Sequence, residues 1–208
     1  MAGRGVLEGA FALLETLDEL GGRAGFAELA RAGDLPKTTT HRLLDQLIEV
    51  GAVERVSGGY RIGTRLFRLG RNWEPELRAA AREWLPVLSA RIRAGTLLAV
   101  RRGDRVVVVA AEGVDARPGT ALSPDAVAAR VLAAPGRGCT TAGPDGAAAG
   151  PGLRGYAAAA DGVAVPVRGP GGAVVAALAA AAPPGRNPLA LVPGLASTAR
   201  VLGTALTG

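Results

Sequence analysis

Residues 35–62 read LPKTTTHRLLDQLIEVGAVERVSGGYRI, and this stretch decides the fold class. Pro36 suits the first position of a helix, where its missing N–H leaves no hydrogen bond unmade. The apolar spacing that follows predicts a helix from Pro36 to Val50, which Gly51 ends. Residues 52–56 and 60–62 predict two short strands across a Ser57-Gly58-Gly59 turn, so we expect a β-hairpin after the helix.

Two further helices are predicted upstream. Apolar side chains recur every three or four residues from Val6 to Leu20, and Gly21-Gly22 ends that period. Residues 26–32 predict a short second helix, which Gly33 ends. The order helix, helix, turn, helix, hairpin is that of a winged helix-turn-helix.

The third predicted helix has an apolar side and a polar side. The apolar side is expected to be buried and holds Thr40, Leu43, Leu44, Leu47 and Ile48. The exposed side begins with hydroxyl and basic groups and ends with acids: Thr38, Arg42, Asp45 and Glu49, with Thr39 and Gln46 at the flank. A recognition helix that enters the major groove by its N-terminus needs this order, since acids at that end would repel phosphates.

The charge is unevenly distributed along the chain. The net charge is +6, but residues 1–35 carry −3 and residues 36–72 carry +4. Between Arg55 and Arg71 there are five arginines and no acid. A run of one sign indicates a contact with a polyanion, with an arginine-rich linker that has no partner as the alternative.

These residues resemble the helix-turn-helix of the IclR family of bacterial transcriptional regulators. The specific part of the resemblance is Leu35-Pro36-Lys37 followed by His41-Arg42-Leu43-Leu44. Further matches are Val6-Leu7 through Leu14, Glu28-Leu29-Ala30, Leu47, Gly51, Val53-Glu54-Arg55 and Gly59 to Gly63. The resemblance implies a DNA-binding domain at residues 1–63 and a linker helix at residues 64–73.

The family's second half is a GAF-like α+β sensor with an antiparallel sheet, and residues 74–208 resemble a shortened version that serves for effector binding and dimerisation. We expect helices at Trp73 to Arg93, Ser123 to Ala134 and Pro188 to Leu206, and hairpins at 97–111 and 163–178. Ser123 is expected to cap its helix, with Pro124 following.

The second half also departs from the family pattern. Residues 134–156 are rich in Gly, Ala and Pro where the family usually has a helix and a strand. The acid and the Cys that many members carry before the Ala164-Val-Pro-Val motif are missing, and Gly162 stands near the Cys position. The effector-binding residues are therefore left unknown, and a constitutive regulator without a pocket stays open.

Several function classes are excluded by composition. A single Cys139 and a single His41 exclude a disulfide framework, a multi-cysteine zinc site and a histidine-rich metal centre. The G-x-G-x-x-G at Gly150–Gly155 lacks the strand and helix that a nucleotide fingerprint needs. We therefore expect no enzyme, no cofactor and no metal. No apolar run approaches a membrane span, and residues 1–8 do not read as a secretion signal, so a cytoplasmic setting is expected.

The sequence leads to a hypothesis about DNA contacts. Thr38, Thr39 and Arg42 would meet base edges or phosphates, and Lys37, His41, Arg55 and Arg61 would mainly hold phosphates. Gly58 would let the wing tip approach the backbone. For His41 the alternative is packing or a solvated surface, and for Tyr60 the alternative is packing of the wing strand against the helices.

The predicted function is sequence-specific binding of double-stranded DNA as a repressor, acting as a dimer, or a tetramer, on an inverted repeat, with a small organic effector, often a carboxylate. Leu66, Phe67 and Leu69 are candidates for the dimer interface, with covering of the sheet as their alternative role. A second hypothesis is a winged-helix module that binds protein or ligand for assembly, without specific DNA binding. An enzyme is the third, and no residue constellation supports it.

Overall fold

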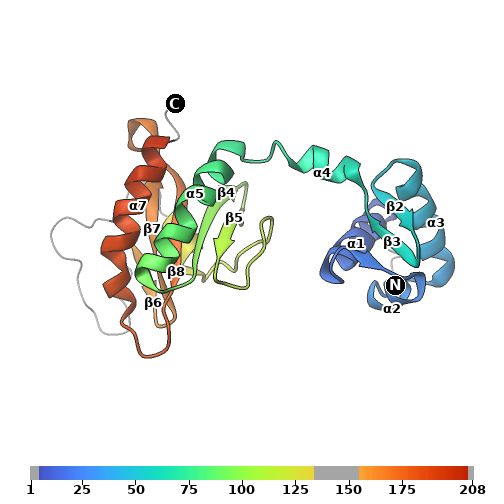
Figure 1. The fold of residues 1–208 in the computed structure, drawn as a ribbon, viewed down its shortest axis with the longest axis horizontal. Helices are drawn as coiled ribbons and strands as arrows, with labels where there is room; N and C mark the ends of the chain where they lie inside the picture. Colours follow the sequence, from blue (N-terminus) through green and yellow to red (C-terminus); the bar gives the residue numbers. More distant parts are fainter. Residues whose placement is uncertain (1–4, 134–154, 206–208) are drawn as a thin grey trace. The chain divides into compact units, whose positions relative to one another are not determined.

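The computed structural model describes residues 5–133 and 155–205. The chain divides into two compact units, Met1–Trp73 and Glu74–Gly208, and each has its own hydrophobic core (Figure 1). Among the described residues, the first unit is helical with a three-stranded sheet, and the second is built on a five-stranded antiparallel sheet. The predicted α+β fold class is confirmed.

The N-terminal unit contains the predicted helices and hairpin. Helix α3 begins at Lys37, one residue later than predicted, because Pro36 has an extended backbone and occupies the N-cap position. The hairpin turn is also tighter than predicted, since Gly59 belongs to a strand. The elements are α1 (Val6–Glu19), β1 (Arg23–Ala24), α2 (Phe26–Ala32), α3 (Lys37–Glu49), β2 (Val53–Val56), β3 (Gly59–Ile62) and α4 (Thr64–Gly70).

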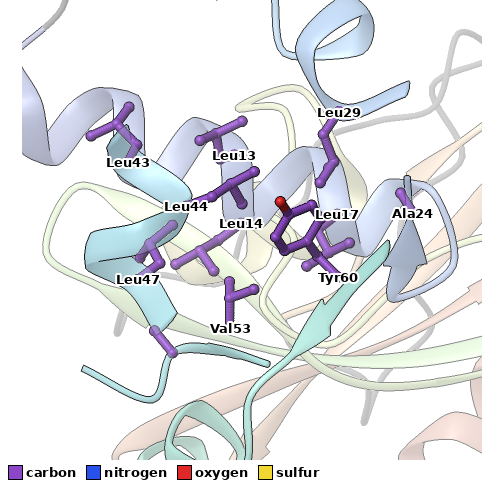
Figure 2. Close-up of a cluster of buried hydrophobic side chains, with 11 residues drawn as sticks. Leu13, Leu14, Leu17, Ala24, Leu29, Leu43, Leu44, Leu47, Val53 and Tyr60 are labelled. Atoms are coloured by element: carbon purple, nitrogen blue, oxygen red, sulfur yellow. The ribbon is translucent and has the colours of Figure 1, made fainter. Parts of the chain in front are cut away.

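Helices α1 and α3 are joined by a leucine core (Figure 2). Leu13 and Leu17 of α1 and Leu43 and Leu44 of α3 each expose 1% of their surface. Burying a leucine side chain contributes about 1.5–3 kcal/mol. Gly9 lets the helices approach closely, since a Cβ there would lie 3.0 Å from Leu43 Cδ1. The burial of one face of α3 fixes its opposite face toward solvent.

Strand β1 was not predicted, because a strand of two residues is too short to show an alternation of apolar and polar side chains. It pairs with β3 and places Ala24 opposite Tyr60, so the sheet order is β1-β3-β2. The pairing requires glycine at position 59, where a Cβ would lie only 2.2 Å from the Ala24 carbonyl oxygen. The wing is therefore packed against the body of the unit at its base.

The C-terminal unit has the sheet order β5-β4-β8-β7-β6, and every neighbouring pair is antiparallel. Its regular elements are α5 (Pro75–Ile92), β4 (Thr96–Arg102), β5 (Arg105–Glu112), α6 (Val127–Ala133), β6 (Ala157–Ala159), β7 (Gly162–Arg168), β8 (Val174–Ala181) and α7 (Val192–Ala205). Short 3-10 helices lie at Pro170–Gly172 and Pro188–Leu191. Both predicted hairpins are present.

Helices cover both faces of this sheet. Figure 1 shows α5 and α7 over one face, and Arg91 joins them through hydrogen bonds to Ser197 and Thr198 at 3.2 and 3.0 Å. Helix α6 packs on alternate residues of the strands, which point to the other face and are mostly alanine: Ala99, Ala157, Ala164, Ala177 and Ala179. Small side chains let α6 lie close to the strands.

The prediction that Ser123 caps helix α6 is wrong. The helix begins at Val127 rather than after Ser123, because residues 124–126 form a turn first. The Ser123 hydroxyl accepts a hydrogen bond from the Asp125 amide at 3.3 Å and so closes that turn. The Gly-rich stretch, Cys139 and the predicted helix end at Ala134 lie outside the described residues.

Substitution of Gly59 tests the packing of the wing. We expect Gly59→Ala to lower the free energy of unfolding of the N-terminal unit by about 2 kcal/mol or more, because the new Cβ would displace β1. Gly70→Ala is the control, since a Cβ at Gly70 meets open space and should change stability by less than about 1 kcal/mol. Urea unfolding measures both, and equal stability of the two variants would contradict the close approach.

Candidate nucleic-acid interface

Helix α3 presents a polar face with few internal partners. Thr38 and Arg42 are exposed, Thr39 is half-buried, and none of these three side chains makes a hydrogen bond or ion pair with the described part of the chain. Thr40 is fully buried, and its hydroxyl donates to the Pro36 carbonyl oxygen at 3.1 Å. The predicted division of the helix into a buried and an exposed side is therefore confirmed.

The N-terminal end of α3 is electropositive. Lys37 is exposed, the first turn holds no acid, and no side chain caps the helix. Unpaired N–H groups and the helix dipole favour negative charge at such an end. This end can therefore attract a phosphate or an acceptor on a base edge.

His41 lies on the same side of α3 but has two partners. Its Nδ1 lies 2.9 Å from a carboxylate oxygen of Asp45, one turn later. Its ring meets the ring of Phe26 edge to face, with centroids 6.0 Å apart. The imidazole is therefore oriented by α2 and α3 together, which leaves Nε2 for an outside partner.

Arg55 of the wing reaches back to α3. Its guanidinium lies 3.6 Å from Asp45 and 5.4 Å from the centre of the Tyr60 ring. Tyr60 itself exposes only 7% of its surface and belongs to the leucine core (Figure 2). The structure thus favours packing of the wing strand against the helices as the role of Tyr60. The Arg55 guanidinium lies over the ring of Tyr60.

Arg61 is paired with an acid that lies just before the Arg55–Arg71 run of arginines. Its Nε and Nη2 donate to the same oxygen of Glu54 at 2.8 and 2.6 Å. The other oxygen of Glu54 accepts from the Thr64 amide at 3.1 Å, at the start of α4. These contacts, the Thr64 amide first and Arg61 next, hold the pKa of Glu54 below its usual value.

The register of the hairpin explains this pair. Glu54 stands directly opposite Arg61 across β2 and β3 because only Ser57 and Gly58 form the turn. A two-residue turn would have placed Glu54 opposite Arg61 in the sequence-based prediction. The three-residue turn predicted from the sequence shifts the pairing of the two strands by one residue. The arginines of the wing are therefore partly neutralised by neighbouring carboxylates.

The wing tip is held by an arginine that the sequence did not single out. The Arg23 guanidinium of β1 donates to the Ser57 carbonyl oxygen. Gly58 is exposed and has a φ of +85°, a conformation that favours glycine. Nothing in the sequence pattern pointed to Arg23, because its role depends on the pairing of β1 with β3.

Within residues 74–133 and 155–205, the C-terminal unit shows no comparable polar site. Among the described residues no group of three or more His, Cys, Asp and Glu side chains is placed to hold a metal ion. A shallow depression lies beside the C-terminal end of α5, lined by Ser89, Arg93 and Glu112 among others, and it is open to solvent. Within the same ranges, no helix is both long and apolar enough to cross a bilayer.

Comparison with known proteins agrees with this geometry. The model of the IclR helix-turn-helix domain matches residues 6–57. A comparison with curated proteins found no match. Among solved structures, an IclR homolog from Microbacterium hydrocarbonoxydans complexed with 4-hydroxybenzoate is 25% identical, covers 98% of this chain and 99% of its own, and gives a TM-score of 0.72.

Two more distant structures share the fold. HmgR from Pseudomonas aeruginosa is 21% identical, with 96% of this chain and 98% of that chain covered and a TM-score of 0.64. The IclR of Thermotoga maritima is 14% identical, with 97% and 96% covered and a TM-score of 0.65.

The class of protein follows from the first unit, and the similarity to IclR structures extends over nearly the whole chain. Three helices, a wing and an exposed polar face on the third helix define a winged helix-turn-helix DNA-binding domain. The match to the domain model shows an IclR helix-turn-helix domain at residues 6–57, and the similarity over nearly the full length to a solved IclR homolog supports an IclR-family transcriptional regulator.

The Glu54 contacts lead to a pH-dependent stability. Because its pKa is lowered on folding, the stability that Glu54 contributes is present above pH 4.5 and is lost as the pH falls through the lower folded value. Glu54→Gln keeps an acceptor for the Thr64 amide but loses the charge. We expect this variant to be less stable than the wild type at pH 7, with the difference shrinking below pH 4.5.

Urea unfolding at a series of pH values measures this difference. Glu49→Gln is the control, because Glu49 is exposed and makes no hydrogen bond or ion pair among the described residues. A constant gap between wild type and Glu54→Gln across the acid range would contradict the assignment.

Proposed function

We propose that this protein is a repressor that binds a specific double-stranded DNA operator as a dimer on an inverted repeat. The observation that carries the proposal is the exposed face of α3, where the side chains of Thr38, Thr39 and Arg42 have no hydrogen-bond or ion-pair partners within the described residues. A dimer seated across an operator blocks that DNA for other proteins, which is the physical basis for repression. One such domain gives too little specificity for a genome, and two-fold symmetry doubles the contacts.

The side chains divide into two roles. Thr38, Thr39 and Arg42 read base edges, since Arg bonds guanine in a bidentate way and Thr offers a hydroxyl and a methyl. Lys37 and the α3 N-terminus hold phosphate. Both groups lie in the first two turns of α3, so one insertion into the major groove engages them together.

The remaining side chains predicted to contact DNA are already paired with carboxylates of the same unit. His41 and Arg55 share Asp45, and Arg61 is held by Glu54. Exposed ion pairs of this kind are worth only about 0–1 kcal/mol, so a phosphate can replace the carboxylate. These three side chains are proposed as phosphate contacts, with Gly58 at the approach of the wing. Tyr60 is removed from the set because it is buried.

We also propose that a small organic molecule acts on the C-terminal unit. The support is the similarity of the whole chain to the Microbacterium homolog, which was solved with 4-hydroxybenzoate. No residue of this chain is assigned to that ligand. The domain division at residues 1–63, 64–73 and 74–208 is part of the same proposal, with the last segment as the effector and dimerisation domain in a cytoplasmic protein.

The function is tested by the ratio of affinities for cognate and scrambled DNA. We expect DNA from upstream of the protein's own gene to bind about 10³-fold or more tightly than scrambled DNA at physiological salt. Fluorescence anisotropy between about 50 and 300 mM salt measures the ratio and the salt slope together. Absence of binding to either DNA at low salt would instead favour the assembly module, and this would overturn the proposal.

Arg42 is the sharpest test of direct readout. We expect Arg42→Ala to cost about 1–3 kcal/mol on the operator and to flatten the preference at one base position. Arg82→Ala removes the same charge from the exposed surface of α5 and serves as the matched control. Binding selection on randomised operators compares the two variants, and an unchanged base preference in Arg42→Ala would exclude this residue from base readout.

A further inference from the structure

His41 is the side chain of the proposed DNA surface whose charge changes near neutral pH. It is the single histidine of the chain, and its side chain is 62% exposed. Histidine gains and loses its proton between about pH 5 and 8. The lysine and arginines proposed to contact DNA stay charged throughout this range. A change of this surface with pH near neutrality therefore comes from His41.

Asp45 decides which nitrogen of the His41 ring carries a hydrogen. Nδ1 of His41 lies 2.9 Å from Oδ2 of Asp45, and a carboxylate can only accept a hydrogen bond. Nδ1 therefore carries the hydrogen in the neutral ring. A neutral imidazole has a single N–H, so its Nε2 is left with a lone pair. Phe26 meets the ring edge to face and limits its rotation.

The charged groups close to His41 come from α3 and from the wing. The other oxygen of Asp45 lies 3.6 Å from the Arg55 guanidinium of β2, and Lys37 is exposed one turn before His41. Helix α1 meets α3 through buried leucines, and the side chain that faces the imidazole from α2 is the uncharged Phe26. Among the described residues, Asp45 is the carboxylate that pairs with His41. Asp45 thus favours the protonated ring, and the two cations oppose it.

A phosphate can accept a hydrogen bond from this ring in one protonation state only. Nε2 of the neutral ring is an acceptor, and phosphate oxygens are acceptors too, so the two repel. Once Nε2 binds a proton it becomes a donor, and the ring gains a positive charge that Asp45 balances from the Nδ1 side. A hydrogen bond between charged groups is about twice as strong as one between neutral groups. Binding of phosphate and binding of a proton at His41 therefore favour each other.

We propose that Asp45 is a positioning residue that makes DNA binding depend on a proton at Nε2 of His41. Asp45 keeps the hydrogen of the neutral ring on Nδ1, so Nε2 can donate to a phosphate only after it has bound a second proton. The interface takes up this proton from solvent when it closes on DNA, and its affinity rises as the pH falls. This inference rests on the proposed DNA binding and gives a role to an acid that would otherwise only repel phosphate.

The pH dependence of DNA affinity tests the role of His41. We expect the dissociation constant of the wild-type chain to rise about fivefold or more from pH 6 to pH 8 at constant low salt. In His41→Gln, which keeps a polar side chain but binds no proton, it should change by less than about twofold. Fluorescence anisotropy measures both, and the amino terminus and Cys139 cancel because both chains have them. The stability change assigned to Glu54 lies below pH 4.5, outside this window.

The outcomes of this experiment separate the inference from the proposed function. Scrambled duplex DNA serves as well as operator DNA, because the phosphates are the same in every sequence. Equal wild-type affinity at pH 6 and pH 8 overturns the inference while DNA binding stands, and so does a His41→Gln chain that keeps the wild-type pH dependence. A chain that binds no DNA at either pH overturns both.

Nitrogen NMR of the histidine ring tests the role of Asp45 without DNA. The single histidine gives one set of imidazole signals, which distinguish a nitrogen that carries hydrogen from one that does not. At pH 8 we expect the hydrogen on Nδ1 in the wild type and shared between Nδ1 and Nε2 in Asp45→Ala. Glu49→Ala removes the same charge from an exposed position one turn further along α3 and should leave the signals unchanged. A wild-type ring with its hydrogen on Nε2, or signals that do not change in Asp45→Ala, would overturn the role of Asp45.

Discussion

The burial of leucines between α1 and α3 is the interaction on which the DNA-binding unit depends. Leu13 and Leu17 from one helix and Leu43 and Leu44 from the other are almost entirely removed from water. This burial sets the rotation of α3 about its own axis. Once that rotation is set, the hydroxyl and basic side chains of α3 face solvent at no further cost, and the wing is packed beside them by β1.

Much of this unit follows from sequence, because its signals are local. The period of apolar residues, Pro36 before α3 and the glycines after each helix mark the helices to within a residue or so. The faces of α3 are equally predictable, since a helix of 13 residues has only one way to bury Leu43, Leu44 and Leu47 together with Thr40. A strand of two residues such as β1 has no such signal and exists only because β3 lies beside it.

The electrostatic partners of the candidate site depend on tertiary placement. Counting charges along residues 55–71 gives a purely basic segment, yet Glu54 and Asp45 stand beside Arg61 and Arg55 in space. One residue of register in the hairpin decides whether Glu54 stands opposite Arg61. Tyr60 shows the same limit, because an aromatic residue in a short strand can point either way until the pairing is known. In the C-terminal unit, the alanine-rich strands predict the sheet, but their sequences contain no polar pattern that indicates a ligand-binding site.

Glu54 has a consequence for how the wing and the start of α4 depend on each other. Its carboxylate is shared between Arg61 in the wing and the first amide of α4, the helix that leads toward the C-terminal unit. A phosphate that takes Arg61 leaves the carboxylate to the helix alone. Free-energy coupling is reciprocal, so any force that shifts the start of α4 also alters how readily the wing releases its arginine. A single carboxylate thus couples the wing to the first turn of α4.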